Sequence, residues 1–280
     1  MARLRPMTFS IVARSTDGES WGVAVASKFL AVGAVVPAAV AQVGAIATQA
    51  DANVAYKGLA LAHLDDGATA SVALQRLLEE DDKRDERQVG IVDSEGGAAS
   101  HTGHGCLHWA GGVTGAGYAI QGNVLAGEFV VEAMQDAFEA TDADEPLARR
   151  LLAALAAGDD AGGDRRGRQS AALLVVRDGA GYAGGDDIVA DLRVDDHADP
   201  VTELSRLLDL NDLYLTASTE AERVPITPDL GEEIEGLLHR LGYADLNSWV
   251  GTENYEMRVD PHGAWIDEKV LDALREAATS

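Results

Sequence analysis

Three arginines fall within four positions of a glycine-rich segment, residues 162–170. They are Arg165, Arg166 and Arg168, and two glycines precede them, so the backbone can turn tightly there. A guanidinium group binds a carboxylate through two parallel hydrogen bonds, which suits Arg for holding an anionic substrate. The apolar run that follows, residues 171–176, is typical of a buried strand. The segment therefore predicts an anion-binding loop at the mouth of a strand.

Gln169 and Ser170 lie between the arginines and the apolar run, so the same site could use them to bind a substrate. An alternative interpretation of the loop needs no ligand. The arginines would then form a solvated basic turn that offsets nearby acidic residues, which are Asp159, Asp160 and Asp164. The sequence leaves both interpretations open.

Three histidines, His101, His104 and His108, surround the single cysteine, Cys106. His104 and His108 are four positions apart, but glycines at 103 and 105 argue against a helix, and the H-E-x-x-H pattern of zinc enzymes is absent. We interpret the segment as a loop over the pocket. Neither a metal nor a cofactor is expected.

The elements that would position these residues alternate between strands and helices. Strands are expected at residues 8–14, 21–26, 45–48, 87–93, 98–101, 117–121, 173–177, 179–181 and 188–194. Helices are expected at residues 56–64, 68–80, 129–140 and 145–157. Asn123, which follows the strand ending at residue 121, is first a candidate for a helix N-cap. This order predicts an α+β layered sandwich.

The last 80 residues differ, because they carry helical spacing and little strand pattern. Helices are expected at residues 201–215, 232–241 and 267–278. We therefore divide the chain into a sandwich domain, residues 1–204, and a small helical module, residues 205–280.

The chain of 280 residues is strongly acidic, with 47 acidic and 22 basic residues and a net charge of -25. Such a surface repels nucleic acid and anionic membranes, so neither is an expected partner. No apolar run reaches the length of about 18 residues that a membrane span needs. The sequence also starts without the apolar core of a signal peptide, so a cytoplasmic location is expected.

Several segments resemble a family of unknown function, DUF1028, which is assigned to the N-terminal nucleophile hydrolase superfamily. The residues that carry the resemblance are 7–14 (MTFSIVAR), 22–33 (GVAVASKFLAVG), 47–50 (ATQA), 87–90 (RQVG), 121–123 (QGN), 162–170 (GGDRRGRQS) and 192–197 (LRVDDH). The tail resembles a peptidoglycan-binding-like module, on the basis of its helix spacing and residues 242–243 (GY) and 249–255 (WVGTENY).

The superfamily resemblance implies a four-layer αββα sandwich and amide hydrolysis by the first residue of a processed chain. That residue uses its own α-amino group as general base, because such an amine has a pKa of roughly 7.7–8.0. Thr8 would be this nucleophile once residues 1–7 are removed. The same would hold if the chain started at Met7 and this methionine were then cleaved. Residues 2–7 stand in front of Thr8 and would block its amine. The alternative is that Thr8 is an ordinary strand residue of a protein without activity.

Within this scheme the chemistry would involve four further residues. Lys28 could lower the pKa of the amine and stabilise developing negative charge, or it could be a lysine at a strand end that reaches water. Thr48 and Gln49 could donate hydrogen bonds to a substrate, and Asn123 could help to stabilise an oxyanion.

Two functions follow from these residues. The first is an N-terminal nucleophile amidohydrolase acting on a small amide or peptide with a carboxylate. The second is a non-catalytic binding protein whose tail binds a cell-wall fragment or a protein partner. A homo-oligomer is possible in either case.

Overall fold

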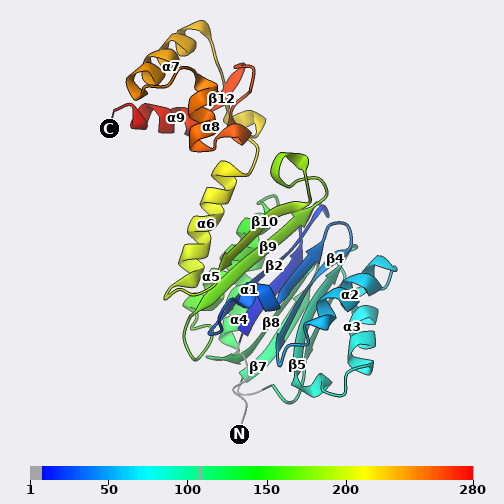
Figure 1. Cartoon of the computed structure of the whole chain (residues 1–280). Helices are drawn as coiled ribbons and strands as arrows, with labels where there is room; N and C mark the ends of the chain where they lie inside the picture. Colours follow the sequence, from blue (N-terminus) through cyan, green and yellow to red (C-terminus); the bar gives the residue numbers. More distant parts are fainter. Residues whose placement is uncertain (1–7, 107–108, 280) are drawn as a thin grey trace. The chain divides into compact units, whose positions relative to one another are not determined.

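The computed structural model describes residues 8–106 and 109–279 of the chain. The chain divides into two compact units, Met1–Leu208 and Asp209–Ser280 (Figure 1). The first unit holds two antiparallel sheets and the helices that cover them, and the second is mainly helical.

The larger sheet has six strands in the order β10-β9-β2-β1-β8-β7, and every neighbouring pair is antiparallel. The strands are β1 (Thr8–Arg14), β2 (Ser20–Ser27), β7 (Trp109–Gly115), β8 (Tyr118–Leu125), β9 (Ser170–Arg177) and β10 (Ile188–Val194). The predicted hairpin at the start of the chain is present, and Gly18 takes the positive φ of 79° that its turn requires.

The smaller sheet has four strands in the order β3-β4-β5-β6, again antiparallel. They are β3 (Pro37–Val40), β4 (Gly44–Ala50), β5 (Arg87–Asp93) and β6 (Ala98–Thr102), and a short helix α1 (Val32–Val35) precedes β3. Residues of β4 and β5 are buried along their whole length, because helices cover one face of the strands and the other sheet covers the opposite face.

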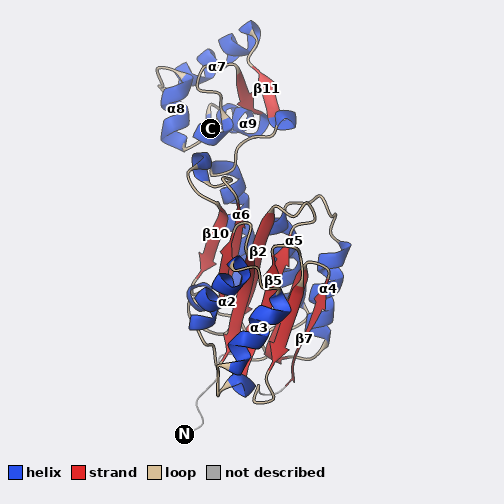
Figure 2. Ribbon diagram, turned by 90° about the vertical axis from the view of Figure 1, so that its right-hand side faces the viewer, coloured by secondary structure: helices blue, strands red, loops and turns tan. Residues whose placement is uncertain are grey.

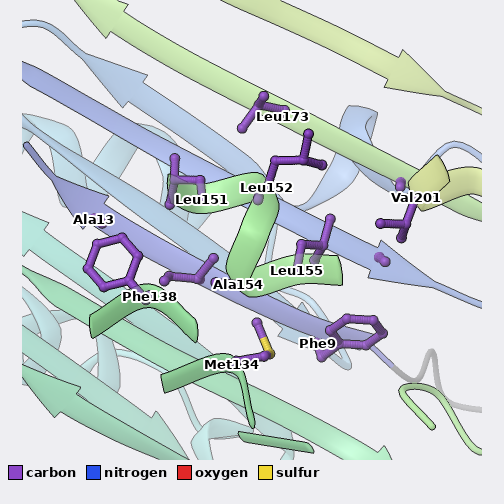
Figure 3. Packing of buried hydrophobic residues seen from close by; sticks show 14 of the residues in the cluster. Phe9, Ala13, Met134, Phe138, Leu151, Leu152, Ala154, Leu155, Leu173 and Val201 are labelled. Atoms are coloured by element: carbon purple, nitrogen blue, oxygen red, sulfur yellow. The ribbon is translucent and has the colours of Figure 1, made fainter. Parts of the chain in front are cut away.

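Helices α4 (Phe129–Ala140) and α5 (Leu147–Asp160) cover the outer face of the six-stranded sheet. Figure 3 shows side chains of this cluster, among them Met134 of α4, Leu155 of α5 and Phe9 of β1, all of which are buried. Helices α2 (Ala55–Asp65) and α3 (Ala70–Glu79) cover the outer face of the four-stranded sheet (Figure 2).

A separate apolar cluster lies between the two sheets, with Val12, Val23 and Val25 from one sheet and Ala45 and Val92 from the other. The order through the unit is thus α4 and α5, the six-stranded sheet, the four-stranded sheet, and α2 and α3. This is the mixed α and β architecture with antiparallel sheets that the sequence predicts.

The second unit is built around a core that contains Trp249, Tyr255 and Leu271. Its elements are the end of α6 (Pro200–Tyr214), β11 (Arg223–Pro225), α7 (Pro228–Leu241), α8 (Leu246–Glu253), β12 (Trp265–Asp267) and α9 (Glu268–Ala277). Helix α7 begins with a Thr227 cap and ends at Gly242, whose φ is 82°. No helix among the described residues is long and apolar enough to cross a membrane.

Several local predictions were wrong or incomplete. Residues 179–181 form a turn instead of a strand, with Gly179 at a φ of 60°. Strands β3 and β7 and helix α8 were not predicted. Strand β3 is short and begins with Pro37, while β7 contains three glycines among its seven residues, so both carry residues that are depleted in strands.

Candidate functional site

Thr8 is the first residue of β1, which lies inside the six-stranded sheet. The register places it opposite Ser27 on β2 and opposite Asn123 on β8, and Ser27 in turn lies opposite Ser170 on β9. Four polar residues therefore form a row across four strands at one end of the sheet. All of them are buried, with at most 2% of each residue exposed.

The Thr8 hydroxyl oxygen lies 3.2 Å from the hydroxyl oxygen of Ser27, and either can donate the proton. The Thr8 carbonyl accepts hydrogen bonds from Gln49 Nε2 at 3.3 Å and from Asn123 Nδ2 at 3.4 Å. Within the described residues, no histidine or carboxylate is hydrogen-bonded to the Thr8 hydroxyl. The described side chains around this hydroxyl therefore supply no such base.

Gln88 on β5 organises the two amides that bind Thr8. Its Oε1 accepts from Gln49 Nε2 at 2.9 Å and from Asn123 Nδ2 at 2.8 Å. Its Nε2 donates to Gly122 O at 2.8 Å and to the Thr102 hydroxyl at 2.9 Å. Because Gln88 is fully buried and bonded on both sides, it fixes the orientation of both amides.

Ser10 and Gln121 extend this network along β1 and β8. Ser10 Oγ donates to Gln49 Oε1 at 2.7 Å and accepts from Gln121 Nε2 at 2.7 Å. Gln121 Oε1 has no hydrogen-bond partner among the described residues, and it lies where a side chain on Gly90 would be. A Cβ added to Gly90 would come within 2.1 Å of it, so a side chain at position 90 would displace the Gln121 amide.

Gln88 and Gln121 were not predicted as site residues. The available signal was a glutamine next to apolar residues within a strand, as in residues 87–93 (RQVGIVD) and 118–125 (YAIQGNVL). A buried amide needs partners, so such a position indicates a network.

Thr48 and Gln49 were expected to act together, but the structure places them on opposite faces of β4. Gln49 faces the other sheet, while Thr48 lies on the face that packs against α2 and donates to Asn53 O at 3.4 Å. Side chains alternate along a strand, so two neighbours cannot share one face.

The prediction that Asn123 caps the N-terminus of a helix was wrong. Strand β8 continues to Leu125, and the N-cap of α4 is Glu128. The pairing of β8 with β7 shifts at this point, and Val124 has a φ of 53°, which is unusual for a β-branched residue. Strained backbone of this kind concentrates at functional sites.

Backbone hydrogen bonds at and beside Val124 join the arginine segment, residues 162–170, to this end of the sheet. Val124 O accepts from Arg165 N at 3.3 Å, and Ala126 N donates to Gly163 O at 3.2 Å. Asp164 is buried and accepts from Lys28 N at 2.7 Å. The arginine segment is therefore anchored beside Thr8 by backbone contacts.

Two of the three arginines are paired with acidic residues of their own surroundings. Arg166 lies 2.9 Å from Asp164, and Arg168 lies 2.8 Å from Asp159. Burial raises the pKa of the Asp159 carboxyl, and the hydrogen bond from Arg168 opposes that shift. These pairs agree with the alternative interpretation of the segment, a basic turn that offsets nearby acidic residues. The Arg165 side chain is exposed and has no acidic partner among the described residues.

The remaining predicted residues hold neighbouring loops. Ser170 Oγ donates to Phe29 O and accepts from Val32 N at 3.1 Å. Gln169 Nε2 donates to Asp196 at 3.1 Å. Lys28 is exposed, and its Nζ donates to Arg168 O at 3.1 Å, so it braces the arginine segment.

The described residues contain no group of three or more His, Cys, Asp or Glu side chains placed to hold a metal ion. His101 contacts Arg84 O at 2.9 Å, and His108 lies outside the described residues. A pocket of about 760 Å³ between α3 and strands β6 and β7 is lined in part by His101, but it includes neither Thr8 nor Gln49.

The comparisons with known proteins agree with both resemblances. Residues 8–204 match the family model described as "Family of unknown function (DUF1028)", and residues 214–274 match the model described as "Putative peptidoglycan binding domain". The chain is similar to the crystal structure of protein SPO2555 from Silicibacter pomeroyi, a DUF1028 protein, with 33% identity and a TM-score of 0.66. The match covers 74% of this chain and 89% of that one. No curated protein matches. The chain therefore belongs to the DUF1028 family and carries a second domain of the peptidoglycan-binding type.

Proposed function

We propose that the first unit is an amide hydrolase of the N-terminal nucleophile type, with Thr8 as its nucleophile. The observation that carries this proposal is the position of Thr8, at the first residue of an inner strand, 3.2 Å from the Ser27 hydroxyl and in register with Asn123. The family match also begins at Thr8. The order of helices, two sheets and helices is compatible with the αββα sandwich of that superfamily.

Activity in this proposal depends on a free Thr8 amine. The hydroxyl has no histidine or carboxylate partner among the described residues, so the α-amino group of Thr8 is the base that remains. The amine takes the hydroxyl proton as the oxygen attacks the substrate carbonyl carbon, and then returns a proton to the leaving amine. This leaves the acyl group as an ester on Thr8, and a water molecule, deprotonated by the same amine, cleaves the ester to release the acid and restore the hydroxyl. Residues 1–7 must be removed before this amine exists.

The other residues support that chemistry. Gln49 and Asn123 hold the Thr8 carbonyl, which orients the nucleophile. Lys28 supplies positive charge near this end of the sheet, and Arg165 is the arginine available to a substrate carboxylate. The proposed substrate is thus a small amide or peptide that carries a carboxylate.

The test compares the full chain with a chain that begins at Thr8, released from a fusion by a protease. Both are assayed on aminoacyl p-nitroanilides with and without a free carboxylate. We expect hydrolysis only by the shortened chain. In the shortened chain, replacing Thr8 with Ser should retain activity and replacing it with Ala should abolish it. Equal activity of the Thr8→Ala chain would remove Thr8 from the mechanism.

A non-catalytic binding protein is the second candidate, and the burial of Thr8 favours it. The residue is 1% exposed, and its carbonyl and hydroxyl both have partners. In this case the second unit, which matches a peptidoglycan-binding model, would bind a cell-wall fragment. Mass spectrometry of the purified chain and titration with muropeptides distinguish the binding protein from the hydrolase. An intact N-terminus together with muropeptide binding would favour the binding protein.

A further inference from the structure

One stretch of the first unit carries no charge at all. Residues 29–50 contain no Asp, Glu, Lys or Arg, although charged residues make up 25% of the chain and its net charge is -25. The stretch includes α1, the edge strand β3 and the buried strand β4. Burial explains part of this composition, because Val32, Val36 and the whole of β4 belong to the core. It does not explain the exposed apolar residues of the stretch.

Large apolar side chains are exposed along this stretch and on the neighbouring helix α2. Leu30 is 59% exposed, Val40 is 43%, Val54 is 49% and Leu59 is 46%. Helix α2 packs against β3 and β4, and Lys57 of α2 donates to Ala34 O of α1 at 3.2 Å. These elements therefore lie side by side, as Figure 1 shows for α1 and α2.

The outward face of α2 is uncharged from residue 54 to residue 62, and its exposed charged residue, Asp65, lies at the end of the helix. Val54, Ala55, Gly58, Leu59 and Ala62 are exposed and follow helical spacing. A surface helix normally carries charged or polar residues on this face. Lys57 is the one charged residue between positions 54 and 62, and its amine is held against α1, where burial lowers its pKa.

We propose that this uncharged surface, formed by Leu30, Ala34, Val40, Val54, Gly58 and Leu59, binds the same surface of a second copy of the chain. Two copies of a protein with a net charge of -25 repel each other, so a self-interface is favoured where acidic side chains are few. The apolar surface meets that condition and gains free energy when it is covered.

A symmetric contact also suits the shape of α2. A Cβ added to Gly58 would meet no atom within 4 Å, so the helix surface is open there and a second helix can approach closely. Leu59, next to it, can fill the space above Gly58 of the other copy in a twofold arrangement. A basic partner would instead be drawn to the acidic remainder of the surface. This inference is independent of the proposed activity.

The first test is the effect of salt on the self-association of the full chain, measured by analytical ultracentrifugation. Added salt screens the repulsion between the two acidic copies, so we expect a dimer that becomes tighter between about 0.02 M and about 0.5 M NaCl. A dimer held by ion pairs would weaken over this range. A monomer at all protein and salt concentrations would overturn the proposal.

The second test places a charge in the interface without disturbing the fold. Gly58→Glu adds a carboxylate to the uncharged surface, and glutamate forms helices better than glycine by about 0.5–1 kcal/mol. We therefore expect an unchanged or raised melting temperature and at least a tenfold weaker dimer. Leu59→Gln should weaken the dimer as well, without adding charge.

Gly251→Glu is the matched control. Gly251 is an exposed glycine of helix α8, and an added Cβ would again meet no atom within 4 Å. This variant makes the same change in charge outside the uncharged surface, so it should dimerise like the parent chain. Equal dimer affinities of the Gly58→Glu and Gly251→Glu chains would show that the uncharged surface is not the interface.

Discussion

Thr8 and Ser27 face each other at the open end of the β1–β2 pair, with their hydroxyl oxygens 3.2 Å apart. Ser27 belongs to the row of polar residues that links Thr8 to Ser170, and Asn123 completes the row on the other side. Thr8 thus lies next to a predicted catalytic residue, Asn123, and two strands away from a predicted substrate-binding residue, Ser170.

The amide network behind Thr8 should be costly to interrupt. In Gln88→Ala, Gln49 Nε2, Asn123 Nδ2 and Gly122 O lose a partner inside the core. Each lost hydrogen bond costs about 1 kcal/mol, and the cavity left by the side chain adds to that cost, so we expect about 3 kcal/mol lost from the free energy of unfolding. Urea unfolding measures this. Gln75→Ala, on the exposed face of α3, should change it by less than about 0.5 kcal/mol. A small effect at Gln88 would mean that water replaces its amide.

Arg168 and Arg165 should differ in their effect on stability, because Arg168 is paired with an acidic residue. Arg168→Gln leaves the buried Asp159 carboxylate without its guanidinium partner. Since Arg168 is 43% exposed and solvent screens the pair, we expect a loss of about 1 kcal/mol at neutral pH. Arg165→Gln should leave the melting temperature unchanged.

The Arg168→Gln loss should also depend on pH. The pKa of Asp159 is raised by burial, and removing Arg168 raises it further. Protonation then relieves the cost of the unpaired carboxylate, so the loss should shrink as pH falls toward the pKa of this group. Thermal unfolding at several pH values measures the trend, and a loss that grows in acid would contradict it.

Asp81 should stabilise the first unit at neutral pH and lose that effect in acid. Arg87 donates to both of its oxygens, at 2.8 and 3.4 Å, and these hydrogen bonds hold the pKa of Asp81 well below its ordinary value. A lowered pKa favours the folded state above about pH 4, where the unfolded carboxyl is ionised, and the gain declines as pH falls below that.

Replacing Asp81 with Asn tests the contribution of its hydrogen bonds and ion pair with Arg87. Asp81→Asn should cost about 3 kcal/mol at pH 7, because Arg87 is 9% exposed and keeps its charge. The difference between parent and variant in urea unfolding should narrow below about pH 4. A constant difference across the acid range would indicate that the ion pair is not its source. Asp66→Asn, at the exposed end of α2, serves as the control.

A fragment of residues 1–220 should fold without the second unit. The first unit has its own core, which includes Leu204 and Leu208 of α6. The cut leaves Leu213 and Tyr214 without the core that they join in the second unit, so the end of α6 should fray. We expect a soluble fragment with one cooperative melting transition. Persistent aggregation would show that the two units depend on each other for folding.

The sequence alone predicts much of the first unit because its signals are local. The hairpin of residues 8–27 follows from two apolar strands and a turn, and the helix at residues 129–140 follows from its spacing; the structure has both. The position of Thr8 at the start of a strand is also predicted from a local pattern. The two domain types were likewise recognisable from residues that stand in short segments.

Tertiary structure decides which of these residues meet. Gln49 and Gln88 belong to one sheet and Thr8 and Asn123 to the other, and the packing of the two sheets brings these four residues together. Tertiary structure also decides that Gln49, rather than Thr48, lies on the face of β4 that meets the other sheet, and the loop geometry gives Arg166 and Arg168 acidic partners. The physical reason is that a buried amide or ion pair is defined by partners from other elements. A local pattern shows that such a group is present, but not which groups it bonds.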